Sequence, residues 1–194
     1  MQYAEKITLC EVGPRDGLQN EAKLLTAEEK TELIEQMIGA GFKVIEVGSF
    51  VSPKAVPQMA NTDEVFLALG QREGVQLRAL IANERGVDRA VACGCSKVKL
   101  NVSASKAHNL ANLNRTPQES VAGFKACVEK AAANVIEVSG SISMAFGSPW
   151  DREIPLEDVK DIVRAYLAVG VTEISLSDAS GMAYPSQVYE MCTQ

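Results

Sequence analysis

The stretch Val-Ser-Gly-Ser-Ile-Ser-Met-Ala at residues 138–145 decides between two arrangements of a sheet. Its three serines alternate with Gly140, Ile142 and Met144. Because successive side chains of a strand point to opposite sides, one face here is apolar and the other is polar. Strands covered by helices on both faces read instead as near-continuous apolar runs. The alternation therefore favours a barrel whose interior opens into a polar site over an open sheet.

Other predicted strands show the same alternation. Glu46 is flanked by Ile45 and Val47, and Ser175 by Ile174 and Leu176. The first strand is not followed by a glycine-rich G-x-G-x-x-G turn, which argues against a dinucleotide-binding sheet.

Strands and helices are expected to alternate along the chain. The predicted strands are 7–12, 44–48, 77–81, 97–101, 138–145 and 171–177. The predicted helices are 27–40, 62–71, 84–93, 117–133, 155–169 and 185 to the chain end. Capping boxes, Thr26 with Glu29 and Thr116 with Glu119, open two of these helices. This order is typical of a parallel sheet.

The spacing of the strands sets the expected size of the domain. Successive strands begin about 33 residues apart, so eight units would need about 264 residues, near the ~250 of a complete eight-unit barrel. The chain has 194 residues. We therefore expect an α/β fold of the parallel (β/α) TIM-barrel type with about six of eight units. The whole chain, 1–194, would form a single, incomplete catalytic domain.

Composition excludes several classes of protein. The net charge is −6 and aromatic residues make up 5% of the chain, so neither phosphate contacts nor base stacking would support nucleic-acid binding. No apolar run approaches the ~20 residues of a membrane span, and no signal peptide is evident. Five cysteines at irregular spacing argue against a disulfide framework. We expect a cytoplasmic protein with no nucleic-acid or membrane partner.

The loop after the first strand combines turn residues with two charges. Arg15 and Asp16 stand between Gly13-Pro14 and Gly17. Catalytic groups of (β/α) barrels lie after the carboxyl ends of strands. A carboxylate there can bind a hard cation, and a guanidinium can stabilise a developing oxyanion. The alternative is a surface Arg–Asp pair on a turn, which is common.

Three segments resemble one family. The run Glu-Val-Gly-Pro-Arg-Asp-Gly-Leu-Gln-Asn-Glu at 11–21 is similar to the opening signature of the 3-hydroxy-3-methylglutaryl-CoA lyases, which belong to a metal-dependent barrel superfamily of Claisen-type synthases and lyases. Residues 46–60 also resemble the lyase pattern, as do 103–105 with 112–116. The resemblance covers nearly the whole chain.

The resemblance implies a reaction and a set of site residues. The reaction would be a retro-aldol cleavage of 3-hydroxy-3-methylglutaryl-CoA to acetyl-CoA and acetoacetate, as in leucine degradation. Asp16 would be a ligand of Mg²⁺ or Mn²⁺, and Arg15 would neutralise the enolate of the leaving group. Glu46 would support Arg15 or the metal site, and Asp178 would be a polar or acid–base group near the substrate. Substrate contacts are expected from Arg15, Gln19, Ser49 and Ser175.

Several of these residues have structural alternatives. Glu46 could be a satisfied buried carboxylate, and Asp178 could cap the next turn. His108, the single histidine, is expected in an exposed loop rather than on a metal.

The chain also departs from the lyase pattern. Gly-Ser-Pro-Trp-Asp-Arg at 147–152 replaces a Gly-Cys-Pro-Tyr-Glu-Gly type segment, and Ser-Asp-Ala-Ser-Gly at 177–181 replaces a segment that usually contains Gly-Asp-Thr. A lyase acting on a related 3-hydroxyacyl-CoA thus stays open as a second interpretation.

The His-x-His metal ligands of the family's seventh strand, its later Asn ligand and its Cys-containing loop are not found in the sequence. We therefore expect a fragment that is inactive alone. A non-catalytic chain that self-associates as a homo-oligomer is the third interpretation.

Overall fold

Three parallel strands organise the N-terminal part of the protein. The computed structural model describes residues 5–194, and the chain divides into two compact units. The first unit comprises the residues up to 98 together with 133–137. Its strands are β1 (Cys10–Glu11), β2 (Val44–Ser49) and β3 (Gln76–Ile81), in the order β1-β2-β3. Ile45 of β2 pairs with Glu11 on one side and with Leu77 on the other.

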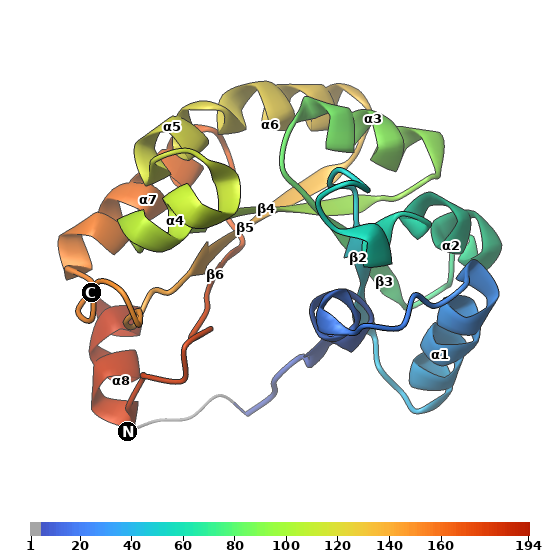
Figure 1. Cartoon of the computed structure of the whole chain (residues 1–194), viewed down its shortest axis with the longest axis horizontal. Helices are drawn as coiled ribbons and strands as arrows, with labels where there is room; N and C mark the ends of the chain where they lie inside the picture. The colour runs from blue at the N-terminus through green and yellow to red at the C-terminus, as the bar shows by residue number, and fades with distance from the viewer. Residues whose placement is uncertain (1–4) are drawn as a thin grey trace. The chain divides into compact units, whose positions relative to one another are not determined.

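Three helices accompany these strands, as the blue to green ribbon in Figure 1 shows. They are α1 (Ala27–Gly39), α2 (Thr62–Leu69) and α3 (Glu84–Ala92). The predicted capping box of α1 is confirmed, since the Thr26 side chain accepts from Glu29 N and the Glu29 carboxylate accepts from Thr26 N. Gly41, with a φ of 101°, follows the end of α1 in the left-handed region that favours glycine.

A bulge in β2 sets which of its side chains face α2. The register against β3 shifts between Glu46 and Gly48. A Cβ atom at Gly48 would lie 2.5 Å from Thr62 Oγ1, so the β2 backbone approaches α2 too closely for any side chain. Ile45, Glu46 and Ser49 are all buried. The end of β2 is thus fixed in place by close packing on α2.

The second unit comprises residues 99–132 and 138–194. Its strands are β4 (Lys97–Ser103), β5 (Glu137–Ser143) and β6 (Ile174–Leu176), in the order β4-β5-β6. The pairing of β5 with β6 is parallel, with Ser141 opposite Ser175. The accompanying helices are α4 (Lys106–Leu113), α5 (Pro117–Ala122), α6 (Phe124–Ala133), α7 (Leu156–Ala168) and α8 (Pro185–Thr193). The first two residues of β4, the first of β5 and the last of α6 belong to the first unit.

The alternation in 138–145 has the predicted structural meaning. Gly140 faces α7, where a Cβ atom would lie 2.9 Å from the ring of Tyr166. The hydroxyl of Tyr166 donates to the carbonyl oxygens of Leu100 and Ser141, at 2.9 and 3.2 Å. Its ring stacks on Phe124 at a centroid distance of 4.6 Å. One face of β5 therefore packs on helices, while its serines lie on the other.

Three predictions about elements need correction. The predicted helix 117–133 is two helices, α5 and α6, because Gly123 interrupts it. The predicted strands 7–12 and 171–177 shorten to two and three residues in β1 and β6. These two strands stand at the two ends of the strand order, where each pairs with one neighbour only, so fewer ladder bonds hold them extended.

His108 is also placed differently from the prediction. It lies in α4 rather than in a loop, and it is half-buried. The cap of α4 is Ser105, whose side chain accepts from His108 N. No helix within residues 5–194 is both long enough and apolar enough to span a bilayer.

Candidate active site

A single helical turn carries the charges that follow β1. Residues Gly13–Gly17 form a one-turn π-helix with Pro14 near its start. The backbone N–H groups of Arg15 and Asp16 both donate to the carbonyl oxygen of Val12, at 3.1 and 2.7 Å. Gly13 N donates to Glu11 Oε1 at 2.6 Å, and a Cβ atom at Gly13 would lie 2.9 Å from that oxygen. A side chain at position 13 would therefore displace the Glu11 carboxylate.

Arg15 links the turn to β2. Its Nε donates to Glu46 Oε1, and its Nη1 donates to Asp16 Oδ1 at 2.6 Å. Glu46 is fully buried, whereas the Asp16 side chain is 53% exposed. A buried carboxylate is costly unless it is paired and hydrogen-bonded, and the guanidinium supplies that partner. Nη2 of Arg15 has no hydrogen bond to any residue from 5 to 194, so it can bind a further oxygen.

Gln19 joins the same group. Its Nε2 donates to Asp16 Oδ1 at 2.9 Å, the oxygen that also accepts from Arg15. Asn20 Nδ2 donates to the Asp16 carbonyl oxygen at 2.8 Å. The first unit thus brings together Arg15, Asp16, Gln19 and Glu46, and the contact of Glu46 with Arg15 is one that the resemblance implied.

Ser49 lies at the end of β2 with an unusual environment for a serine. Its side chain is buried, and its Oγ has no hydrogen-bond partner within the described residues. Its backbone N–H donates to Thr62 Oγ1 at 3.3 Å. A buried hydroxyl without a partner costs roughly 1–3 kcal/mol. The Ser49 hydroxyl can therefore form a hydrogen bond with a ligand atom.

Ser175 and Asp178 belong to the second unit, whereas the group around Arg15 belongs to the first. Ser175 Oγ donates to the Gly140 carbonyl oxygen at 3.3 Å. The Asp178 carboxylate accepts from the backbone N–H groups of Met182 and Ala183, each at 3.0 Å. Asp178 therefore organises the loop that precedes α8, which is close to the capping role named as its alternative.

One polar cluster escaped the sequence analysis. Ser105 Oγ donates to Asp151 Oδ2 and accepts from Ser148 Oγ at 3.1 Å, and both serines are fully buried. The His108 ring lies 5.4 Å from the Trp150 ring, and burial lowers the pKa of His108. The departure of residues 147–152 from the lyase pattern was the one sequence signal for this cluster. It did not show that Ser105, at the start of α4, would bond to this loop.

Divalent-cation binding would need more ligands than this part of the chain offers. Within residues 5–194, no group of three or more His, Cys, Asp or Glu side chains is placed to hold a metal ion. Asp16 is a suitable single ligand, since it is exposed and has a carboxylate. A hard cation takes several oxygen ligands, so the described residues do not complete a metal site.

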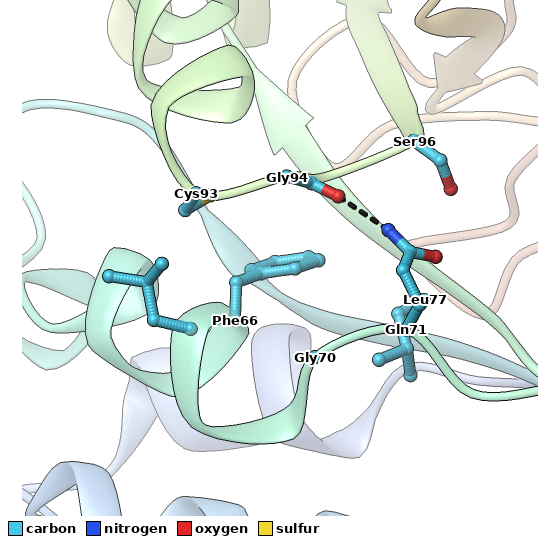
Figure 2. Close-up of a pocket in the computed structure, with 8 residues that line it drawn as sticks. Phe66, Gly70, Gln71, Leu77, Cys93, Gly94 and Ser96 are labelled. Atoms are coloured by element: carbon cyan, nitrogen blue, oxygen red, sulfur yellow. Dashed lines mark hydrogen bonds between the residues drawn. The ribbon is translucent and has the colours of Figure 1, made fainter.

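A small cavity of about 160 Å³ lies at the other end of the strands (Figure 2). It is lined by the C-terminal end of α2, by Leu77 near the start of β3, and by the turn Cys93-Gly94 after α3. Gln71 Nε2 donates to the Gly94 carbonyl oxygen at 2.7 Å across it. Residues at the amino ends of barrel strands serve stability rather than chemistry. The cavity is not part of the candidate active site.

Comparison with known proteins identifies the family of the chain. The HMGL-like family matches residues 6–194. A lyase of Pseudomonas aeruginosa, named 3-hydroxy-3-isohexenylglutaryl-CoA/hydroxymethylglutaryl-CoA lyase, is 39% identical over 94% of this chain and 61% of its own length. The chain therefore spans about three fifths of the length of such a relative.

Solved structures extend the comparison to the fold. The HMG-CoA lyase of Bacillus subtilis superposes with a TM-score of 0.95 at 35% identity, over all of this chain and 65% of that one. An HMG-CoA lyase of Acinetobacter baumannii, solved with coenzyme A and 3-methylmalate, gives 0.91 at 38% identity, over 95% of this chain and 60% of that one.

The likeness confirms the expected parallel (β/α) TIM-barrel fold, of which the chain covers a part. Both structures are named as lyases, and the enzymes of the family cleave carbon–carbon bonds. The chain belongs to the HMGL-like family of carbon–carbon lyases.

Proposed function

We propose that the protein carrying this chain cleaves 3-hydroxy-3-methylglutaryl-CoA to acetyl-CoA and acetoacetate. The observation that carries the proposal is the chain of contacts Glu46–Arg15–Asp16, which links β2 to the turn after β1. In the reaction, the C3 hydroxyl loses its proton and the C2–C3 bond breaks. Its electron pair moves onto the thioester as an enolate, which then takes a proton at C2.

Arg15 would stabilise the enolate oxygen. Its guanidinium is held on two sides, by Glu46 at Nε and by Asp16 at Nη1. Nη2 is therefore directed before any substrate binds. A preorganised donor is worth more than a mobile one, because it needs no reorganisation as charge develops.

Asp16 would provide one ligand of a divalent cation. The family is generally metal-dependent, and we infer Mg²⁺ or Mn²⁺ from the oxygen chemistry of a carboxylate. Such an ion polarises oxygen atoms as a Lewis acid. Within residues 5–194, Asp16 is the one ligand we propose for this ion.

The remaining site residues would contact the substrate or the loops around it. Gln19 holds the orientation of Asp16, and the unpartnered hydroxyl of Ser49 is suited to bind a substrate oxygen. We propose Ser175 as a further substrate contact. Asp178 would act near the substrate as a polar or acid–base group, in addition to organising its loop.

A related 3-hydroxyacyl-CoA is the alternative substrate. Trp150 stands where the lyase pattern has a tyrosine, and its side chain is exposed. The Pseudomonas aeruginosa relative is named for a thioester with a larger isohexenyl group. Both observations favour testing thioesters that differ at C3.

The test is an assay of the complete protein that contains this chain, with Mg²⁺ or Mn²⁺, on a panel of 3-hydroxyacyl-CoA thioesters. The expected result is equal release of acetyl-CoA and acetoacetate from hydroxymethylglutaryl-CoA. Preferential cleavage of a larger thioester would favour the alternative. Absence of cleavage for every member of the panel would reject both.

We place the protein in the cytoplasm. Support comes from the cysteines, all five of which lie in the described residues and form no disulfide, as is usual where thiols are kept reduced. Association as a homo-oligomer remains a proposal, to be tested by the mass of the purified protein in solution.

A further inference from the structure

Lys30 is a buried cation that the proposed reaction does not use. It lies on α1 and is 3% exposed. No carboxylate of residues 5–194 forms an ion pair with it, and burial lowers its pKa. A buried ammonium without a carboxylate is costly, and hydrogen bonds to neutral acceptors offset part of that cost. Its contacts should therefore explain its presence.

The ammonium holds the segment that joins β2 to α2, residues 50–61. Lys30 Nζ donates to the Gln58 carbonyl oxygen and, at 2.6 Å, to Asn61 Oδ1. An ammonium has donors alone. It therefore fixes the amide of Asn61 with its oxygen toward Lys30 and its Nδ2 on the opposite side.

Both of these partners reach the segment after the Arg15 turn. Asn61 Nδ2 donates to the Leu25 carbonyl oxygen at 3.0 Å. Gln58 Nε2 donates to the Glu21 carbonyl oxygen at 2.9 Å. Residues 21–25 follow that turn after one short 3-10 helix, Leu18–Asn20. One buried cation thus joins the loops that follow β1 and β2.

We propose that Lys30 is a positioning residue, which keeps the Arg15 turn aligned with the end of β2 through Asn61 and Gln58. This inference rests on the proposed function, because it assigns Lys30 to the same site. Arg15 lies on the turn after β1 and reaches Glu46 within β2, so the pair depends on how that turn is held against β2. A shift of about 1 Å at a catalytic group can cost on the order of 10²-fold in rate.

Two variants separate positioning from a merely structural role. Lys30→Met removes the ammonium and keeps an apolar stem of similar length. Asn61→Asp keeps an acceptor for Lys30 and gives it a counter-charge, but removes the donor to the Leu25 carbonyl oxygen. A structural role for Lys30 predicts that Asn61→Asp is harmless. Positioning predicts that both variants loosen residues 13–25. Lys125→Met, at an exposed lysine on α6, is the matched control.

The experiment is hydrogen–deuterium exchange of the complete protein, combined with steady-state kinetics. The exchange rate of residues 13–25 should rise about tenfold or more in both variants. Exchange in helices α1 to α8 should not rise. In Lys125→Met, exchange in residues 13–25 should not change. The kcat for thioester cleavage should fall on the order of 10²-fold with a smaller change in KM.

Unchanged exchange in residues 13–25, a rise shared by every helix, or a harmless Asn61→Asp would overturn the inference. A wild-type protein that cleaves no thioester would instead reject the proposed function. The exchange measurement would still decide whether Lys30 positions the turn.

Discussion

At the scale of single residues, Arg15 depends on two partners that differ in exposure. Glu46 is buried beneath its Nε, and Asp16 is half-exposed beside its Nη1. The adjacency of Arg15 and Asp16 made both of them predictable from sequence, and strand alternation made an inward Glu46 predictable. The contact between Arg15 and Glu46 required the structure, because it joins a turn and a strand residue that are 31 residues apart.

Arg15→Lys should remove most of the activity while keeping the charge. A lysine has one donor group on a flexible stem, so it cannot hold Glu46 and Asp16 and also present a directed donor. We expect kcat to fall about 10²–10³-fold with a smaller change in KM. Steady-state kinetics of the complete protein measure both. Arg72→Lys, at the exposed pair with Glu35, is the control, and an unchanged kcat in Arg15→Lys would contradict the assigned role.

At the scale of elements, the sequence predicted helix ends from local signals but did not predict contacts between distant segments. Capping boxes and the glycine after α1 located helix ends correctly, because those signals are local. The division of 117–133 at Gly123 was missed, since an isolated glycine inside a helical pattern is often tolerated. Lys30 was also missed, because nothing near it in the sequence shows that its partners would be Gln58 and Asn61.

Gly48→Ala should destabilise the first unit by about 1–3 kcal/mol, the usual cost of overpacking. The added Cβ would lie 2.5 Å from Thr62 Oγ1. Thr62 cannot move freely, because that oxygen accepts from Ser49 N and donates to the Met59 carbonyl oxygen. Urea unfolding measures the free energy. Gly39→Ala is the matched control, since no atom lies within 4 Å of its added Cβ. Equal stability of the two variants would show that β2 has more space than the structure gives it.

At the scale of the whole molecule, family and fold followed from sequence more readily than the metal site did. The signature at 11–21 indicated the family, and the strand alternation indicated a barrel. The comparisons confirm the family and the fold. A cation site is assembled from several ligands that are distant in sequence, and residues 5–194 bring no three His, Cys, Asp or Glu side chains together to hold one. The segment 147–152 departs from the lyase pattern, and there the buried Ser105 bonds to the buried Ser148 and to the exposed Asp151.

Buried thiols should make the protein sensitive to alkaline pH. Burial raises the pKa of Cys93 to about 11 and that of Cys95 to about 12, from 9.0. Between pH 9 and 11 the unfolded chain loses these protons while the folded chain keeps them. The stabilisation is therefore complete below pH 9 and declines as pH rises, by up to about 1.4 kcal/mol per pH unit for each thiol.

Urea unfolding at pH 8, 9, 10 and 11 measures this decline. The exposed thiols Cys10 and Cys192 provide the comparison, since replacing them with alanine should leave the slope against pH unchanged. Cys95→Ala should instead flatten the slope, although it lowers stability at pH 8 by leaving a small cavity. A slope that is the same in Cys95→Ala and Cys192→Ala would show that thiolate formation is not what weakens the fold at high pH.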